Sequence, residues 1–143
     1  MYNFKFHESN NKEIDFYREG LTRDEYVNLL IDSSKAFKIF YDTDGNAICI
    51  AGVVNLKNQN WYWQFLTDKF PTDYIPKKFI EEYLEFTTAN LNKYERGYCT
   101  IIKENRFAKW LLLHGKKRKN WIVTPVLEEN GPDRVTYRVE RGV

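Results

Sequence analysis

The chain has 143 residues, which is about the size of one typical domain, and we expect residues 1–143 to form a single one. Apolar residues make up 43% of it and charged residues 29%, a balance that predicts a packed core and excludes a disordered chain. With 22 basic and 20 acidic side chains the net charge is +2, which excludes nucleic-acid binding over the whole surface.

No apolar run in the sequence has the length needed to span a membrane, and the N-terminus lacks a signal-peptide pattern. Cys49 and Cys99 each lie inside an apolar run, so we expect buried thiols in a reducing compartment. Because there is no CxxC and no partner histidine, we expect no metal site. These features predict a cytoplasmic protein without membrane or metal partners.

The first elements in chain order are a predicted strand and two helices. Residues Tyr2–His7 alternate aromatic and polar side chains, which is typical of a half-buried strand. A short helix is expected over Lys12–Glu19. Thr22 and Glu25 have the spacing of a capping box, which predicts that a second helix begins there.

A three-stranded meander is predicted next. Residues Ala36–Tyr41 and Ala47–Leu56 are strand-like runs separated by Asp44-Gly45, a strong turn signal. A third run, Asn60–Leu66, continues the meander. Its alternation places Trp61, Trp63 and Phe65 on one face and Tyr62 and Gln64 on the other.

Helices and strands alternate in the second half. The longest predicted helix covers Pro76–Tyr94, with proline in the first turn, where its missing N–H costs nothing. A strand at Tyr98–Ile102 follows. A helix over Glu104–Leu113 is then expected to end at Gly115, a residue type common just after helices.

Two strand-like runs, Trp121–Leu127 and Val135–Val139, close the chain, with a hairpin turn expected at Asn130-Gly131. The full order is one strand, two helices, three strands, then helix, strand, helix and two strands. The core is expected to contain Phe79, Ile80, Tyr83, Leu84, Ile101, Phe107 and Leu111.

This order resembles that of the GNAT acetyltransferase superfamily over nearly the whole chain. The best local match is the segment from Glu104-Asn105 to Gly115, which is similar to the family's fourth-helix motif, although it is one residue short and Lys116 replaces the usual Phe. The resemblance implies an α/β (α+β) fold class, with a mixed, mostly antiparallel twisted sheet flanked by helices on both faces.

Within that superfamily the chain is most similar to the small GNAT-like internal virion proteins of short-tailed phages. The shared features are the length, the aromatic run Asn60–Leu66, a helix that ends in Leu-x-His-Gly and an aromatic C-terminal hairpin. This resemblance implies a protein that is made in the host cytoplasm and packaged in a virion.

The glycine loop that GNAT enzymes use to bind the CoA pyrophosphate is missing. Glycines in such a loop let backbone N–H groups approach the anion closely. The matching stretch, residues 67–75, contains no glycine but has Pro71, Asp68 and Asp73. Lys77 and Lys78 would partly compensate as phosphate ligands, but ordinary solvent exposure explains them more simply.

No catalytic residue is predicted. Many GNAT enzymes place a tyrosine in the fourth helix to protonate the leaving thiolate, and the matching positions here are Leu111 and Leu112, which cannot donate a proton. Tyr98 or Tyr94 would be geometric substitutes, but both are more simply core or interface aromatics.

Two surface features are candidate binding sites. The basic run of Lys116, Lys117, Arg118 and Lys119 would contact a polyanion such as nucleic acid, or would be an ordinary exposed loop. Aromatics near the third meander strand are the second candidate. The resemblance implies that acetyl-CoA would lie in a slot between the strands Asn60–Leu66 and Tyr98–Ile102. With Phe70 these aromatics are expected to fill that slot, and those left exposed would bind a protein partner: Trp61, Tyr62, Trp63 and Tyr74.

Two hypotheses of function follow. The first is a non-catalytic, acetyltransferase-like phage protein that uses no cofactor and binds a phage structural protein or a host protein. The alternative is an active acetyl-CoA-dependent N-acetyltransferase with a divergent cofactor loop. In that case the backbone of Phe65 and Leu66 would hold pantetheine, Lys77 and Lys78 would replace the loop, and Asn105 would begin the fourth helix.

Overall fold

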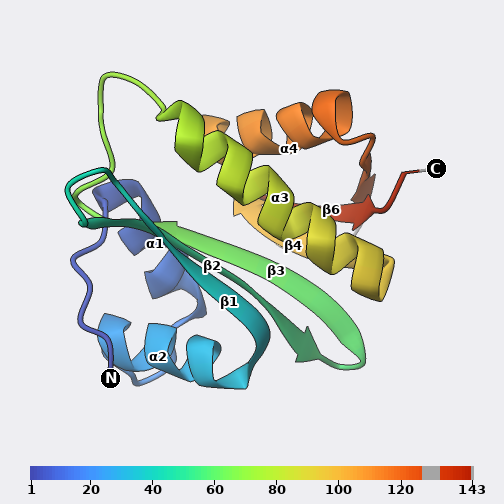
Figure 1. Ribbon diagram of the computed structural model, residues 1–143. Coiled ribbons are helices and arrows are strands. Elements are labelled where there is room, and N and C mark those ends of the chain that lie inside the picture. Colours follow the sequence, from blue (N-terminus) through green and yellow to red (C-terminus); the bar gives the residue numbers. More distant parts are fainter. Residues whose placement is uncertain (127–132, 143) are drawn as a thin grey trace.

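A central twisted sheet with helices on both faces forms the fold (Figure 1). The computed structural model describes residues 1–126 and 133–142. The strands in these ranges are β1 (Ser34–Tyr41), β2 (Ala47–Leu56), β3 (Gln59–Leu66), β4 (Arg96–Ile102), β5 (Ile122–Val126) and β6 (Arg134–Glu140). The helices are α1 (Glu8–Tyr17), α2 (Arg23–Ser33), α3 (Lys77–Tyr94) and α4 (Arg106–Arg118).

The sheet has the strand order β1-β2-β3-β4-β6-β5, and every neighbouring pair is antiparallel except β3 and β4. These two parallel strands are joined by the long helix α3, as a parallel connection requires a crossover. They register at one pair only, Trp61 with Tyr98, whereas the other pairings are continuous ladders. Beyond that pair, β3 and β4 diverge.

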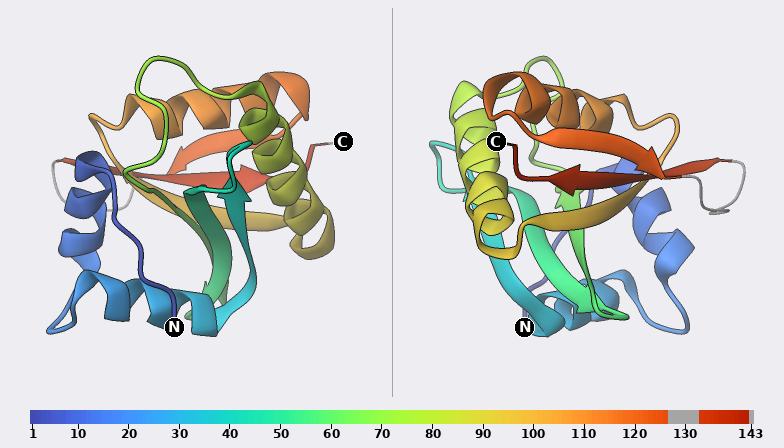
Figure 2. Two further views of the ribbon diagram at one scale, coloured as in Figure 1. Left: turned by 60° about the vertical axis from the view of Figure 1, so that its left-hand side comes forward. Right: turned by 90° about the vertical axis from the view of Figure 1, so that its right-hand side faces the viewer.

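Both faces of the sheet are covered, with α1 and α2 on one and α3 and α4 on the other (Figure 2). Strand β2 is therefore buried at every position from Ile48 to Val54, as expected for a strand between two helical layers. On the α3 and α4 face Phe40, Ile48 and Leu66 pack against helix residues. On the other face Ile50 and Phe65 pack against α1 and α2.

The predicted fold class is confirmed, and several local predictions hold in detail. Strand β2 spans the predicted residues, and Thr22 forms a capping box with Glu25 at the start of α2. Four of the seven predicted core residues are buried: Phe79, Leu84, Ile101 and Leu111. The other three are partly buried against the core: Ile80, Tyr83 and Phe107.

The predicted N-terminal strand is wrong. Residues 2–7 make one isolated bridge, between Phe6 and Thr67, because the segment passes the end of β3 and does not run along it. Helix α1 begins at Glu8, and the ring of His7 accepts a hydrogen bond from the Ser9 amide as its cap.

Gly115 does not end the fourth helix, which continues to Arg118. The glycine is needed for a close approach instead, since a Cβ at this position would lie 1.9 Å from the ring of Trp121. The basic residues Lys116, Lys117 and Arg118 therefore occupy the last helical turn, where positive charge is favoured by the helix dipole. The turn predicted at Asn130-Gly131 lies outside the described residues.

We predict that Gly115→Ala destabilises the protein by roughly 1–3 kcal/mol, because the added methyl group overlaps the buried Trp121 ring. Urea denaturation of both proteins measures this change. The matched control is Leu113→Ala in the same helix, whose side chain is exposed and whose effect is expected within about 0.5 kcal/mol. Equal effects of the two substitutions would contradict the close packing.

Candidate functional site

The divergence of β3 and β4 leaves a cavity of about 340 Å³ between them. Its walls include residues 61–65 of β3 and 99–101 of β4. Tyr17 and Tyr26 line it from the α1 and α2 face, and Tyr83 and Leu112 line it from the α3 and α4 face. Because both helical layers contribute, the cavity passes through the sheet.

The predicted aromatic plug is wrong. Phe70 is buried in a different place, with its ring centroid 5.2 Å from that of Phe79 and 5.3 Å from that of Phe107. Tyr74 is 66% exposed and does not line the cavity. Trp61, Tyr62 and Trp63 are half-buried and form the cavity wall without filling it. The loop after β3 turns away from the slot toward α3, which sequence alternation could not reveal.

Helix α1 closes the wide end of the divergence. Asn10 Oδ1 accepts a hydrogen bond from the backbone amide of Leu66, the last residue of β3. One helical turn later Glu13 Oε1 accepts from the amide of Ile102, the last residue of β4, at 3.0 Å. Both side chains are buried. One helix thus satisfies the final amides of two strands that cannot pair with each other.

In the ladder between β2 and β3, the backbone polar groups of successive β3 residues point alternately toward β2 and away from it. This alternation directs the Leu66 amide toward β4. The Thr67 amide donates to the Ile48 carbonyl at 3.0 Å, so its neighbour Leu66 presents its polar groups to the opposite side. The Leu66 carbonyl accepts from the His7 amide at 2.9 Å. Both backbone groups of Leu66 are therefore already engaged by the N-terminal segment.

A buried ion pair fixes Glu13 in place. Its Oε2 lies 3.0 Å from a guanidinium nitrogen of Arg134 on β6, and both side chains are almost fully buried. The same guanidinium stacks 3.4 Å from the centre of the Phe16 ring. Because burial of two charges requires close pairing, this contact holds α1 in one orientation against the sheet.

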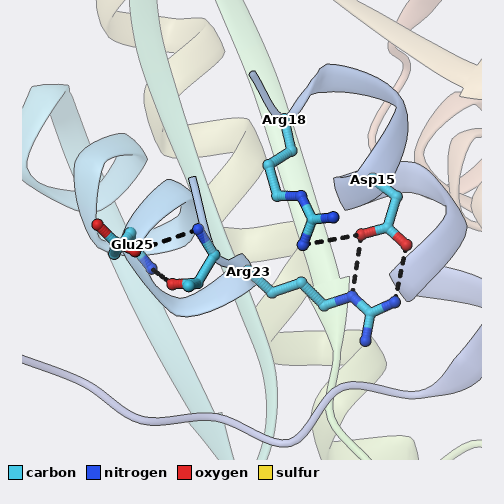
Figure 3. Close-up of polar contacts among 5 residues, drawn as sticks. Asp15, Arg18, Arg23 and Glu25 are labelled. Atoms are coloured by element: carbon cyan, nitrogen blue, oxygen red, sulfur yellow. Dashed lines mark hydrogen bonds and ion pairs between the residues drawn. The ribbon is translucent and has the colours of Figure 1, made fainter. Parts of the chain in front are cut away.

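Exposed ion pairs connect α1 to α2 (Figure 3). Arg23 donates to both carboxylate oxygens of Asp15, at 3.0 and 2.7 Å, and Arg18 lies 3.6 Å from the same group. The hydrogen bond from Arg23 lowers the pKa of Asp15 below its ordinary value. Helix α1 is thus linked to its neighbour helix as well as to β6.

The first amides of the segment that replaces the phosphate loop are paired with protein oxygens. The Asp68 amide donates to the Lys5 carbonyl at 2.8 Å, and those of Lys69 and Phe70 donate to Thr67. Amides that are paired in this way cannot converge on an anion. Lys77 and Lys78 are exposed at the start of α3 and do not line the cavity, and Lys78 lies 3.7 Å from Glu82.

Asn105 has the capping role that its motif predicts, since its Oδ1 accepts from the Ala108 amide at 3.1 Å. It also lines the cavity, as does Leu112, whereas Leu111 lies in the core. Tyr98 packs against Trp61 and does not line the cavity, nor does Tyr94.

Sequence reasoning missed the residues of α1 and Tyr26 of α2, whereas it named Tyr62 as a candidate binding residue and Tyr83 as a core residue. Asn10, Glu13 and Tyr17 lie on one face of α1 at helical spacing, and polar residues in a buried stripe were the available signal. The cavity tyrosines are Tyr17, Tyr26, Tyr62 and Tyr83, and burial raises the pKa of each of them, that of Tyr26 to about 12. Their hydroxyls are therefore protonated near neutral pH.

The remaining candidates contribute no further site. Arg118 pairs with Glu81, while Lys116 and Lys117 are exposed and Lys119 is half-buried. Desolvation raises the pKa of the Cys99 thiol, which lines the cavity, to about 12. In residues 1–126 and 133–142, no group of side chains is suited to hold a metal ion. No helix in the same part of the chain is long and apolar enough to cross a membrane.

A mostly antiparallel sheet with one diverging parallel pair, crossed by a long helix between those strands, defines the GNAT acetyltransferase fold, and this chain has that fold. The sequence itself matches no protein-family model and no curated protein.

Three solved structures illustrate the similarity of fold. Spermidine N-acetyltransferase from Vibrio cholerae, solved with CoA and spermine, superposes with a TM-score of 0.58 and 16% identity over 92% of this chain and 82% of that one. An N-acetyltransferase from Staphylococcus aureus Mu50 superposes with a TM-score of 0.52 and 10% identity over 96% of this chain and 97% of that one. A GNAT-family acetyltransferase from Streptococcus pneumoniae superposes with a TM-score of 0.51 and 13% identity over 86% of this chain and 78% of that one.

We predict that Arg134→Met lowers the free energy of unfolding by about 3–5 kcal/mol, because it leaves the Glu13 carboxylate buried without its partner. Glu13→Gln keeps an oxygen for the Ile102 amide but removes the charge, so the double variant should lose less than Arg134→Met alone. Chemical denaturation of the four proteins of this cycle measures the coupling. If the losses of unfolding free energy in the two single variants simply add in the double variant, the coupling is contradicted.

The matched control for this cycle is Arg138→Met on the same strand. Arg138 is 38% exposed and pairs with Glu140 on its own strand, so a change of less than about 1 kcal/mol is expected.

Proposed function

We propose that this protein is a non-catalytic, acetyltransferase-like protein that acts by binding, with its cofactor entrance closed by α1. The observation that carries the proposal is the pairing of Asn10 with the Leu66 amide and of Glu13 with the Ile102 amide. These amides end the two diverging strands, where an extended ligand entering between the strands would need them. A pantetheine arm would have to displace both side chains and expose the buried charge of Glu13.

The phosphate-binding end supports the same conclusion. The amides of Asp68, Lys69 and Phe70 are bound to protein oxygens, so the loop has no free donors directed at a pyrophosphate among these residues. Pro76 caps α3 without a side-chain hydrogen bond. Lys77 and Lys78 are the remaining cations there, and exposed lysines bind phosphate only weakly without a backbone cradle.

The second candidate function is acetyl transfer with a divergent cofactor loop, and the cavity between β3 and β4 favours it. Tyr83 lines this cavity with a protonated hydroxyl, as a donor to a leaving thiolate would. The Vibrio cholerae neighbour was solved with CoA. In this reading the backbone of Phe65 and Leu66, with Lys77, Lys78 and Asn105, would contact the cofactor after α1 had moved.

The proposed partner is a protein, from a phage particle or from a host cell, following the resemblance to small virion proteins of phages. Of the four aromatics first expected to contact it, Tyr74 is the exposed one, and it would form part of the contact. The basic turn around Lys116 and Lys117 would provide contacts to acidic groups of such a partner. Mass spectrometry of purified particles tests the virion role, and absence of the protein there would exclude it.

We predict that isothermal titration of the purified protein with acetyl-CoA gives no heat of binding up to millimolar cofactor, because α1 closes the entrance. Free CoA serves as the parallel titrant, since it tests the nucleotide part alone. A saturable isotherm with micromolar affinity, about −8 kcal/mol, would contradict the non-catalytic proposal and favour the transferase.

A further inference from the structure

The cavity in the divergence has the size and the lining of a small-molecule site. Its volume of about 340 Å³ is more than twice that of the cavities of about 150 Å³ known to hold benzene, and it falls in the range of small-molecule sites. Aromatic and aliphatic side chains from all parts of the fold form most of its wall, among them Trp63, Phe65, Leu30 and Leu112.

Two polar atoms in the wall have no hydrogen-bond partner in the part of the chain that the structure describes. The hydroxyl of Tyr62 and the Oε1 of Gln64 are both shielded from solvent, and neither makes a hydrogen bond to a described residue. Both residues line the cavity from the same face of β3. Since a buried polar atom without a hydrogen bond costs about 1–3 kcal/mol, these two atoms mark where a ligand would gain polar contacts.

The charges of the wall restrict the ligand further. Glu13 and Lys57 are the charged residues that line the cavity. Glu13 is neutralised by Arg134, and Lys57 is exposed at the β2–β3 turn, so the interior offers no free charge from the described residues. The exposed lining residues Leu56, Lys57 and Tyr17 show where the cavity meets solvent, away from the start of α3.

We propose that the cavity binds a small, neutral, largely apolar molecule that carries a hydrogen-bond donor, such as an aromatic amine or a phenol. The donor binds Gln64 Oε1, and the apolar body packs against Tyr83, Leu112 and Trp121, which line the cavity on the same face of the sheet as Tyr62 and Gln64. The proposal rests on the proposed function in one respect: with α1 closed, the cavity is too small and too poor in cations for a nucleotide cofactor.

The neutral fluorophore N-phenyl-1-naphthylamine tests this proposal, because it has two ring systems and one amine donor. Titration into the wild-type protein should give a saturable rise in probe fluorescence and quench tryptophan emission, because Trp61, Trp63 and Trp121 line the cavity. Gln64→Leu should bind the probe about five- to tenfold more weakly, which corresponds to the loss of one hydrogen bond. The matched control is Gln59→Leu, an exposed position on the same strand, which should bind as the wild type does.

A second variant tests the location independently of the hydrogen bond. Leu112→Trp enlarges a half-buried lining residue on α4, so it should reduce probe binding while circular dichroism shows an unchanged fold. The proposal is overturned if the wild type shows no saturable signal or if both variants bind as tightly as the wild type.

The outcomes separate this proposal from the proposed function. Probe binding without acetyl-CoA binding supports both proposals. If neither the probe nor acetyl-CoA binds, the ligand proposal is contradicted and the proposed function is not. If acetyl-CoA binds and displaces the probe, the cavity belongs to a cofactor site and both proposals fail.

Discussion

The structure depends on one constraint: two neighbouring parallel strands separate after a single registered pair, and their buried amides must still be hydrogen-bonded. An unpaired buried backbone group costs as much as a lost hydrogen bond, so nearly all such groups find partners. In this protein the partners of Leu66 and Ile102 are two side chains of α1, Asn10 and Glu13. The position of α1 follows from that requirement.

Meeting this requirement brings a charge into the interior, and the rest of the arrangement compensates for it. The carboxylate of Glu13 needs a cation, which Arg134 supplies from β6, and Arg134 in turn stacks on Phe16 of α1. The two halves of the sheet are thereby joined through a helix. What remains of the divergence is a largely apolar cavity that the side chains of β3 and β4 surround but do not fill.

Local signals in the sequence predicted most of the fold. Periodicity located β2 and α3, and capping patterns located Thr22 and Asn105 at the starts of α2 and α4. Alternation correctly placed Trp63 and Tyr62 on opposite faces of β3. Each of these features depends on residues that are close in the sequence, so a single chain is enough to recognise it.

The features on which the proposed function rests depend on contacts between distant residues, and they were not predicted. Glu13 and Arg134 are 121 positions apart, and Asn10 and Leu66 are 56 apart. The end of α4 was predicted wrongly, because Gly115 allows the close approach of the Trp121 ring and does not end the helix. The slot was expected to be filled because no local pattern reveals that the loop carrying Phe70 turns toward α3.

The central claim is that α1 satisfies the final amides of β3 and β4, and hydrogen exchange measured by NMR tests it most directly. The account predicts that the amides of Leu66 and Ile102 exchange as slowly as that of Ile50 in the buried strand β2. It also predicts that Glu13→Ala speeds the exchange of Ile102 by tenfold or more, on the order of one lost hydrogen bond, while Leu66 stays protected. Exchange of both amides at the rate of an unstructured peptide in the wild-type protein would contradict the account.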